Sequence, residues 1–117
     1  MKKTKAELEN EISASVADFL NEQMGEHAHS VTAFLSGNTV TVRATHCLAP
    51  GEKMLVRDEE SWRLFKELKN QQFEKVKSYL QERLEKITAS KVLDMESVLG
   101  QNGVRFELFT LNRNLES

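Results

Sequence analysis

All three histidines and the single cysteine of this chain lie between His27 and Cys47. Imidazole nitrogen and thiolate sulfur are ligands that zinc and similar divalent metals prefer. If residues 27–47 form a β-hairpin, His29 and His46 lie opposite each other, with His27 and Cys47 close by. We therefore name His29 and His46 as a candidate metal site. The spacing matches no standard zinc pattern and a fourth ligand is not evident, so a polar pair at the open end of a hairpin explains the same residues.

Three carboxylates form a second candidate group. Asp94 and Glu96 alternate along one expected strand, and Glu107 lies on the next one. Clustered carboxylates can carry out acid–base chemistry or hold a hard cation. Arg43 and Arg105 could neutralise them instead, and the sequence places no cleft around them. We expect these carboxylates on a solvated sheet face rather than in an active site.

Sequence motifs that would indicate catalysis are absent. His46 and Cys47 are adjacent, so on a strand their side chains point to opposite faces and do not form a catalytic dyad. The chain contains no glycine-rich phosphate loop, no Gly-x-Ser-x-Gly motif and no His-Glu-x-x-His motif. We expect a protein that is not an enzyme and that binds no cofactor.

Charge and composition argue against several classes of protein. Sixteen basic and 18 acidic residues give a net charge of −2, which disfavours a nucleic-acid binder that neutralises phosphates. A lone cysteine forms no internal disulfide and suits a reducing compartment. The sequence has no apolar stretch of the ~20 residues that span a membrane. It also has no apolar stretch of the kind found in secretory signals. We expect one cytoplasmic domain over residues 1–117, with residues 1–3 and 112–117 frayed.

The stretch 58–90 must position these groups, because it is the longest regular element in the sequence. It contains neither glycine nor proline, and its apolar residues recur every three to five positions. They are Trp62, Phe65, Leu68, Phe73, Val76, Leu80, Leu84 and Ile87. The pattern predicts one helix of about 45–50 Å, longer than the ~35 Å diameter of a compact domain of this size. Unless it bends near Asn70, this helix overhangs its domain, and its apolar stripe favours a homodimer.

The other elements follow from shorter patterns. Residues 4–24 are amphipathic and predict a first helix, and residues 31–44 and 92–111 alternate in polarity as two antiparallel hairpins do. Pro50 could open a short helical turn before the long helix. The order α-β-β-α-β-β predicts an α+β fold, a four-stranded antiparallel sheet with two helices, the second of them long, on one face.

The turns predict which residues face each other across each hairpin. A two-residue turn at Gly37-Asn38 gives the first hairpin one wholly apolar face. The expected pairs there are Leu35–Val40, Ala33–Val42 and Val31–Ala44. A four-residue turn at 100–103 predicts the pairs Leu99–Val104, Met95–Leu108 and Leu93–Thr110.

This register leaves an apolar surface on the sheet face that the helices do not cover. Its expected members are Phe34, Val92, Val98, Phe109 and Leu111. So much exposed apolar surface indicates a partner, and a second subunit is the simplest one. The expected interface residues are Phe34, Phe109, Leu111 and Val92, together with Trp62 on the overhanging helix.

The run from Val40 to Ser97 resembles the core of the MpsC-like proteins, long known as a domain of unknown function. In those proteins a hairpin leads through a Leu-x-Pro-x-Glu step into a long charged helix, which ends before a Val-rich strand. The matching residues here are Leu48, Pro50, Glu52, Leu84, Ile87, Thr88 and Val92. The resemblance extends from Leu8 to Leu111. One departure is Ala89-Ser90 at the helix end, where members of the family often have a glycine.

The resemblance implies a role, although it supplies no catalytic residues. It implies a soluble, non-catalytic accessory protein of a bacterial cation-translocating system that generates membrane potential and is linked to bicarbonate uptake. Such a protein would act at the cytoplasmic side of a membrane-transport complex, with any contact to the membrane made through that partner. A dimeric module that binds a small ligand or a metal, in an unknown pathway, remains the alternative.

Overall fold

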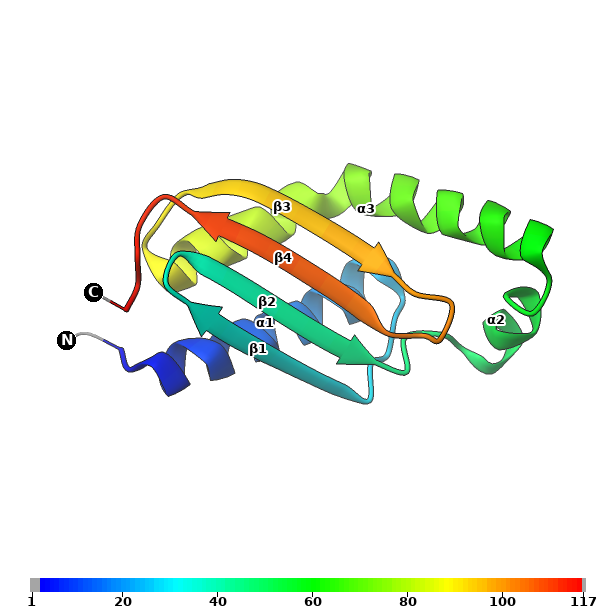
Figure 1. Ribbon diagram of the computed structural model, residues 1–117, viewed down its shortest axis with the longest axis horizontal. Coiled ribbons are helices and arrows are strands. Elements are labelled where there is room, and N and C mark those ends of the chain that lie inside the picture. The colour runs from blue at the N-terminus through cyan, green and yellow to red at the C-terminus, as the bar shows by residue number, and fades with distance from the viewer. Residues whose placement is uncertain (1–2, 117) are drawn as a thin grey trace.

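The computed structural model describes residues 3–116, which form three helices and one four-stranded sheet (Figure 1), with a single hydrophobic core between the sheet and the two longer helices. The elements are α1 (Lys5–Met24), β1 (Ser30–Ser36), β2 (Thr39–Thr45), α2 (Pro50–Leu55), α3 (Glu59–Thr88), β3 (Val92–Leu99) and β4 (Arg105–Leu111). The predicted α+β order is confirmed. The short helix α2 develops from the turn expected at Pro50, since proline is favoured in the first turn of a helix.

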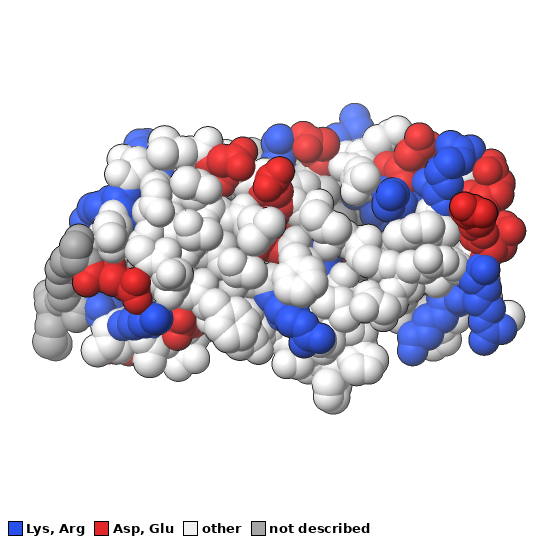
Figure 2. Space-filling model, in the orientation of Figure 1, with Lys and Arg blue, Asp and Glu red and all other residues white. Residues whose placement is uncertain are grey.

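The sheet is antiparallel throughout, with strand order β1-β2-β4-β3. Helices α1 and α3 lie on one face, and the opposite face is open to solvent (Figure 1). Charged side chains are sparse over the strands on that open face and gather at the end where α2 meets α3 (Figure 2). The core therefore lies between the inner face of the sheet and the two helices. No helix formed by residues 3–116 covers the outer face.

Helix α1 follows the sequence expectation closely. Thr4 and Glu7 form the capping box, and Gly25 ends the helix with a left-handed φ of 64°. One stripe of the helix is buried against the sheet. Its members are Leu8, Ile12, Val16, Phe19, Leu20 and Met24.

Helix α3 is the longest element and sets the shape of the molecule. Asp58 caps it by accepting a hydrogen bond from the Ser61 N–H, and 30 residues then continue without a break. The protein measures 49 × 23 × 22 Å, and the first half of α3 projects past the sheet with α2 beside it (Figure 1). We call this projection, residues Pro50 to Leu68, the arm. The overhang expected from the length of the helix is therefore present.

The first hairpin has the predicted register. Leu35 pairs with Val40 and Ala33 pairs with Val42. The inward-facing side chains of this hairpin are buried in the core, because the two-residue turn at Gly37 fixes which residues face the helices.

The predicted register of the second hairpin is wrong by one residue. Leu99 pairs with Arg105 rather than Val104, and Met95 pairs with Phe109 rather than Leu108. The connection spans residues 100–104, one residue more than expected, and Gly103 takes a φ of 83° within it. A shift of one residue exchanges the two faces of a strand, so every side chain of β4 points to the face opposite the predicted one.

This exchange corrects part of the predicted interface. Phe109 and Leu111 are completely buried in the core rather than exposed on the outer face. Phe106 and Leu108 take their places on the outer face, opposite Val98 and Glu96 of β3. Phe109 and Leu111 therefore contribute to stability, and neither is available for contact with a partner.

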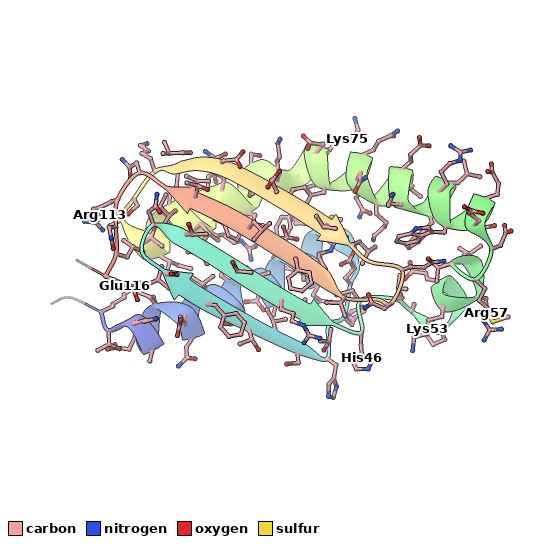
Figure 3. The ribbon with its side chains drawn as sticks, viewed as in Figure 1. His46, Lys53, Arg57, Lys75, Arg113 and Glu116 are labelled. Atoms are coloured by element: carbon pink, nitrogen blue, oxygen red, sulfur yellow. The ribbon has the colours of Figure 1, made fainter. Side chains whose placement is uncertain are left out.

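The C-terminal residues are held in place, although the sequence analysis expects 112–117 to fray. The Leu115 N–H donates to the Gly37 carbonyl (3.0 Å), and the Gly37 N–H donates to Glu116 (2.7 Å). Glu116 also pairs with Lys5 at 2.9 Å. Figure 3 shows Arg113 and Glu116 at the end of the molecule opposite the arm. Lys3 is paired with Glu11, and residues 1, 2 and 117 of the expected frayed ends lie outside the described part of the chain.

Arg113 explains how α3 ends without a glycine. Ala89 takes the left-handed conformation, with a φ of 52°, that glycine adopts without strain. The last helical carbonyl, that of Thr88, accepts hydrogen bonds from Arg113 (2.8 Å) and from the Ser90 hydroxyl (3.1 Å). The C-terminal segment thus replaces the missing glycine with polar contacts.

We predict that Ala89→Gly stabilises the protein by about 1 kcal/mol. A residue with a Cβ atom is strained in the left-handed conformation, and glycine removes that strain. Urea unfolding followed by circular dichroism measures the change. Ala14→Gly, on the exposed side of α1, is the matched control and should destabilise by about 1 kcal/mol. A loss of stability in Ala89→Gly would show that the left-handed residue carries no strain.

Candidate functional site

The two histidines named as a metal site do lie together. The His29 and His46 rings are in edge-to-face contact, with centroids 5.2 Å apart, at the end of the first hairpin. Both side chains are exposed. Within residues 3–116, no group of three or more His, Cys, Asp or Glu side chains is arranged to hold a metal ion. The pair offers two imidazole ligands, and metal binding by His29 and His46 stays a prediction.

Cys47 does not add a ligand to this pair. Its side chain is buried, and its thiol lies 3.6 Å from the Ala44 carbonyl. Burial raises the pKa of the thiol to about 11, so it is neutral at physiological pH. Because metals and electrophiles require the thiolate, Cys47 behaves as a core residue.

The three carboxylates of the second candidate group do not meet. Asp94 and Glu96 are exposed on the outer face of β3, whereas Glu107 is buried on the inner face of β4. The corrected register of β4 is the reason for this separation. The acid–base group that the sequence suggested therefore does not exist as a unit.

A buried ion cluster lies where the end of α1, the middle of α3 and the start of β4 meet. The Arg105 guanidinium donates two hydrogen bonds to Glu26, from Nε at 2.7 Å and from Nη2 at 2.6 Å. Lys69 contacts the same carboxylate at 3.0 Å and donates to the Met24 carbonyl at 2.9 Å. The Glu26 and Arg105 side chains are each only 1% exposed. Burial opposes the positive charge of Arg105, but the hydrogen bonds and charge of Glu26 outweigh it and raise the arginine pKa.

Glu107 and Ser97 extend the cluster across the sheet. Ser97 donates to Glu107 Oε1 (2.8 Å) and accepts from Arg105 Nη1 (2.7 Å), while Arg105 and Glu107 are 3.9 Å apart. Glu107 Oε2 is buried and has no hydrogen-bond partner among the described residues. Burial raises the pKa of Glu107 to about 8, although Arg105 and Ser97 act to lower it. This carboxyl is therefore largely protonated at neutral pH.

Local sequence patterns do not reveal this cluster, because its members look like surface residues. Arg105 and Glu107 alternate with Phe106 and Leu108, which reads as a strand with its charges outward. Glu26 and Lys69 are 79 and 36 residues from Arg105 along the chain, so their pairing leaves no local signal. The one available signal is the spacing of Arg105 and Glu107, which places both on the same side of β4.

Of the remaining interface residues, Phe34 is 54% exposed on the outer face of β1 and is open to a partner. The predicted outer position of Val92 is wrong, because Val92 pairs with the buried Leu111 and packs against the core. Trp62 is half-buried in the arm and also packs against the core. The arm also exposes four large apolar side chains, which are Met54, Leu55, Leu64 and Leu68.

Comparison with known proteins identifies the family. A family model described as "Na+-translocating membrane potential-generating system (MpsC)" matches residues 4–113, nearly the whole chain. The chain belongs to the MpsC family. The MpsC match confirms the resemblance predicted from the sequence.

A curated relative of this MpsC protein is YbcI of Bacillus subtilis (strain 168), described as an uncharacterized protein. It is 28% identical over 121 residues, which cover 99% of this chain and 98% of YbcI. No solved structure matches the chain. None of the helices in the described part of this MpsC protein is long and apolar enough to cross a membrane.

We predict that Glu107→Gln changes how stability depends on pH. The unfolded chain loses the Glu107 proton near its usual pKa of 4.5, whereas the folded protein keeps it until about pH 8. Unfolding therefore releases a proton between these values, and the wild type loses stability as the pH rises through this window. The variant lacks this loss, so its stability relative to the wild type should increase from about pH 5 to about pH 8.

Urea unfolding at a series of pH values measures this difference. Glu96→Gln, which removes an exposed carboxylate from the neighbouring strand, is the control and should run parallel to the wild type. Parallel curves for the wild type and Glu107→Gln would contradict the prediction.

Proposed function

We propose that this protein is a non-catalytic accessory component of a Na+-translocating system that generates membrane potential and is linked to bicarbonate uptake. It docks on the membrane subunits of that system from the cytoplasmic side. The observation that carries the proposal is the arm, which extends from a protein of the MpsC family and exposes apolar side chains.

The arm has the composition of a protein-binding surface. Met54, Leu55, Leu64 and Leu68 are each between 49% and 62% exposed, which is unusual for large apolar residues in so short a segment. Charges of both signs surround them, with Lys53 and Arg57 at the tip (Figure 3) and acidic residues at the start of α3. An apolar centre with a mixed charged rim fits a protein partner better than a lipid surface, which would favour an excess of basic residues.

The absence of catalysis is part of the proposal. The strongest titratable group, Glu107, is enclosed by Arg105 and Ser97 inside the core, and the two imidazoles stand at an exposed hairpin end. A polar side chain that is enclosed in the core in this way favours a structural role. We also propose that the protein is a homodimer, because the sheet face opposite α1 and α3 has no cover in a single subunit.

Deletion of the gene tests this proposal. We expect cells without the protein to develop a smaller membrane potential when Na+ is added, as reported by a potential-sensitive dye, and to regain it with the wild-type protein. The double variant Leu64→Glu, Leu68→Glu should fail to restore the potential, because it places two charges in the apolar centre of the arm.

Tyr79→Glu is the matched control, since Tyr79 lies on the same helix beyond the arm and is 53% exposed. It should restore the potential as the wild type does. An unchanged Na+-dependent potential in the deletion strain would refute the accessory role.

A second candidate function, binding of a divalent metal ion or small ligand, rests on the contact between His29 and His46. Zn2+ would then raise the melting temperature of untagged protein, and His29→Ala would remove the increase. His27→Ala, which removes an exposed histidine two residues before His29, serves as the control. Unchanged melting with Zn2+ and with chelator would exclude this function.

A further inference from the structure

The sheet face turned away from α1 and α3, hereafter the outer sheet face, carries few charged side chains over its strands (Figure 2) and several exposed apolar ones. Phe34 on β1 and Val98 on β3 are 54% and 55% exposed, and Phe106 on β4 is 38% exposed. Leu108 lies between them and is half-buried. Monomeric proteins rarely leave a surface of this kind without a partner.

The strand register places these side chains in two neighbouring rows. Phe34, Thr41 and Leu108 form one row across β1, β2 and β4. The next row contains Arg43, Phe106 and Val98. Since neighbouring strands are about 4.8 Å apart, side chains in adjacent rows are within contact distance. The rest of the outer sheet face is largely threonine, namely Thr32, Thr39, Thr41, Thr45 and Thr110.

The sheet edges are poorly suited to adding another strand. At the β1 edge the Ala33 N–H donates to the Ser13 hydroxyl (2.9 Å), and the Leu35 N–H donates to Glu9 (2.9 Å), so α1 already satisfies them. The β3 edge carries Asp94 and Glu96, and like charges would meet if two copies of β3 paired around a two-fold axis. A second copy would therefore use the face of the sheet and not its edge.

The charges on the outer sheet face can pair with opposite charges on the same face of a second copy. Arg43 lies on β2, and Asp94 and Glu96 lie on β3, at the far side of the strand order β1-β2-β4-β3. A two-fold axis parallel to the strands places the β1–β2 half of one subunit over the β4–β3 half of the other. In this arrangement β2 lies over the partner's β4 and β1 lies over its β3. Arg43 can then reach the partner's Glu96 diagonally, because Glu96 lies only one strand and one row away from the position that Arg43 faces. This arrangement favours a second copy, because an unrelated partner requires no such match.

The area of the outer sheet face sets the expected strength of the dimer. Four strands at about 4.8 Å spacing and seven residues at about 3.4 Å each cover roughly 450 Å² per subunit, or about 900 Å² for both. Specific interfaces begin near 1,000 Å². We therefore expect a dimer that dissociates in the micromolar range rather than an obligate one.

We propose that the outer sheet face is the homodimer interface, formed by face-to-face packing of two sheets with Arg43 directed toward the partner's Glu96. This inference rests on the homodimer of the proposed function and assigns its surface. It leaves the arm free for the membrane subunits.

Sedimentation equilibrium of the purified protein tests the interface by charge reversal. Arg43→Glu and Glu96→Arg should each raise the dimer dissociation constant roughly tenfold or more, since each places like charges across the interface. The variant that carries both substitutions restores opposite charges and should return close to the wild-type constant. Leu64→Glu in the arm is the control and should dimerise as the wild type does.

Crosslinking provides an independent measurement. Cys47 is buried, so Thr41→Cys introduces the accessible thiol at the middle of the outer sheet face. A short bis-maleimide should convert this variant to a covalent dimer, whereas Gln71→Cys, exposed on α3, should form no covalent dimer.

A wild type that sediments as a monomer up to roughly 100 μM would overturn the inference, because a dissociation constant above that concentration is too weak for a specific interface. A dimer that is weakened by Leu64→Glu and not by Arg43→Glu would also overturn it. Both measurements use the isolated protein, so their outcome is separate from that of the membrane-potential assay. A loss of the dimer with an intact membrane-potential effect, or the reverse, distinguishes the two proposals.

Discussion

The structure depends on one interaction, the buried pairing of Arg105 with Glu26. A charge inside a protein is tolerated only when an opposite charge and hydrogen bonds replace the water it has lost. Glu26 therefore fixes the end of α1 against the start of β4, and Lys69 brings the middle of α3 to the same point. Removing Glu26 leaves Arg105 and Lys69 buried without the carboxylate that both contact, so these elements depend on one another for their positions.

The same pairing explains where the sequence is informative and where it misleads. The first hairpin was predictable because its turn at Gly37 and its alternating apolar residues agree on one register. In β4 the apolar pattern of Phe106 and Leu108 points to one face, while the correct face contains Arg105 and Glu107. Their partners are distant in sequence, so no local pattern could show that these charges belong inside.

The candidate sites divide in the same way. The contact between His29 and His46 was predictable because both residues flank the correctly registered hairpin. The proposed carboxylate group failed with the register of β4, and the support that Arg113 gives to the end of α3 depends on a segment that arrives from the far end of the chain. Helices and turns encoded by neighbouring residues are readable from the sequence, whereas contacts between distant polar residues require the fold.

The ion pair between Lys5 and Glu116 holds two distant points of the chain next to each other. It brings the beginning of α1 beside the C-terminal segment, at the end of the molecule farthest from the arm (Figure 1). A short flexible linker could join these two points, and the chain could be opened in an exposed loop, to give a circular permutant with the same packing. Fluorescent or affinity fusions attached near residue 116 would likewise stand well clear of the arm.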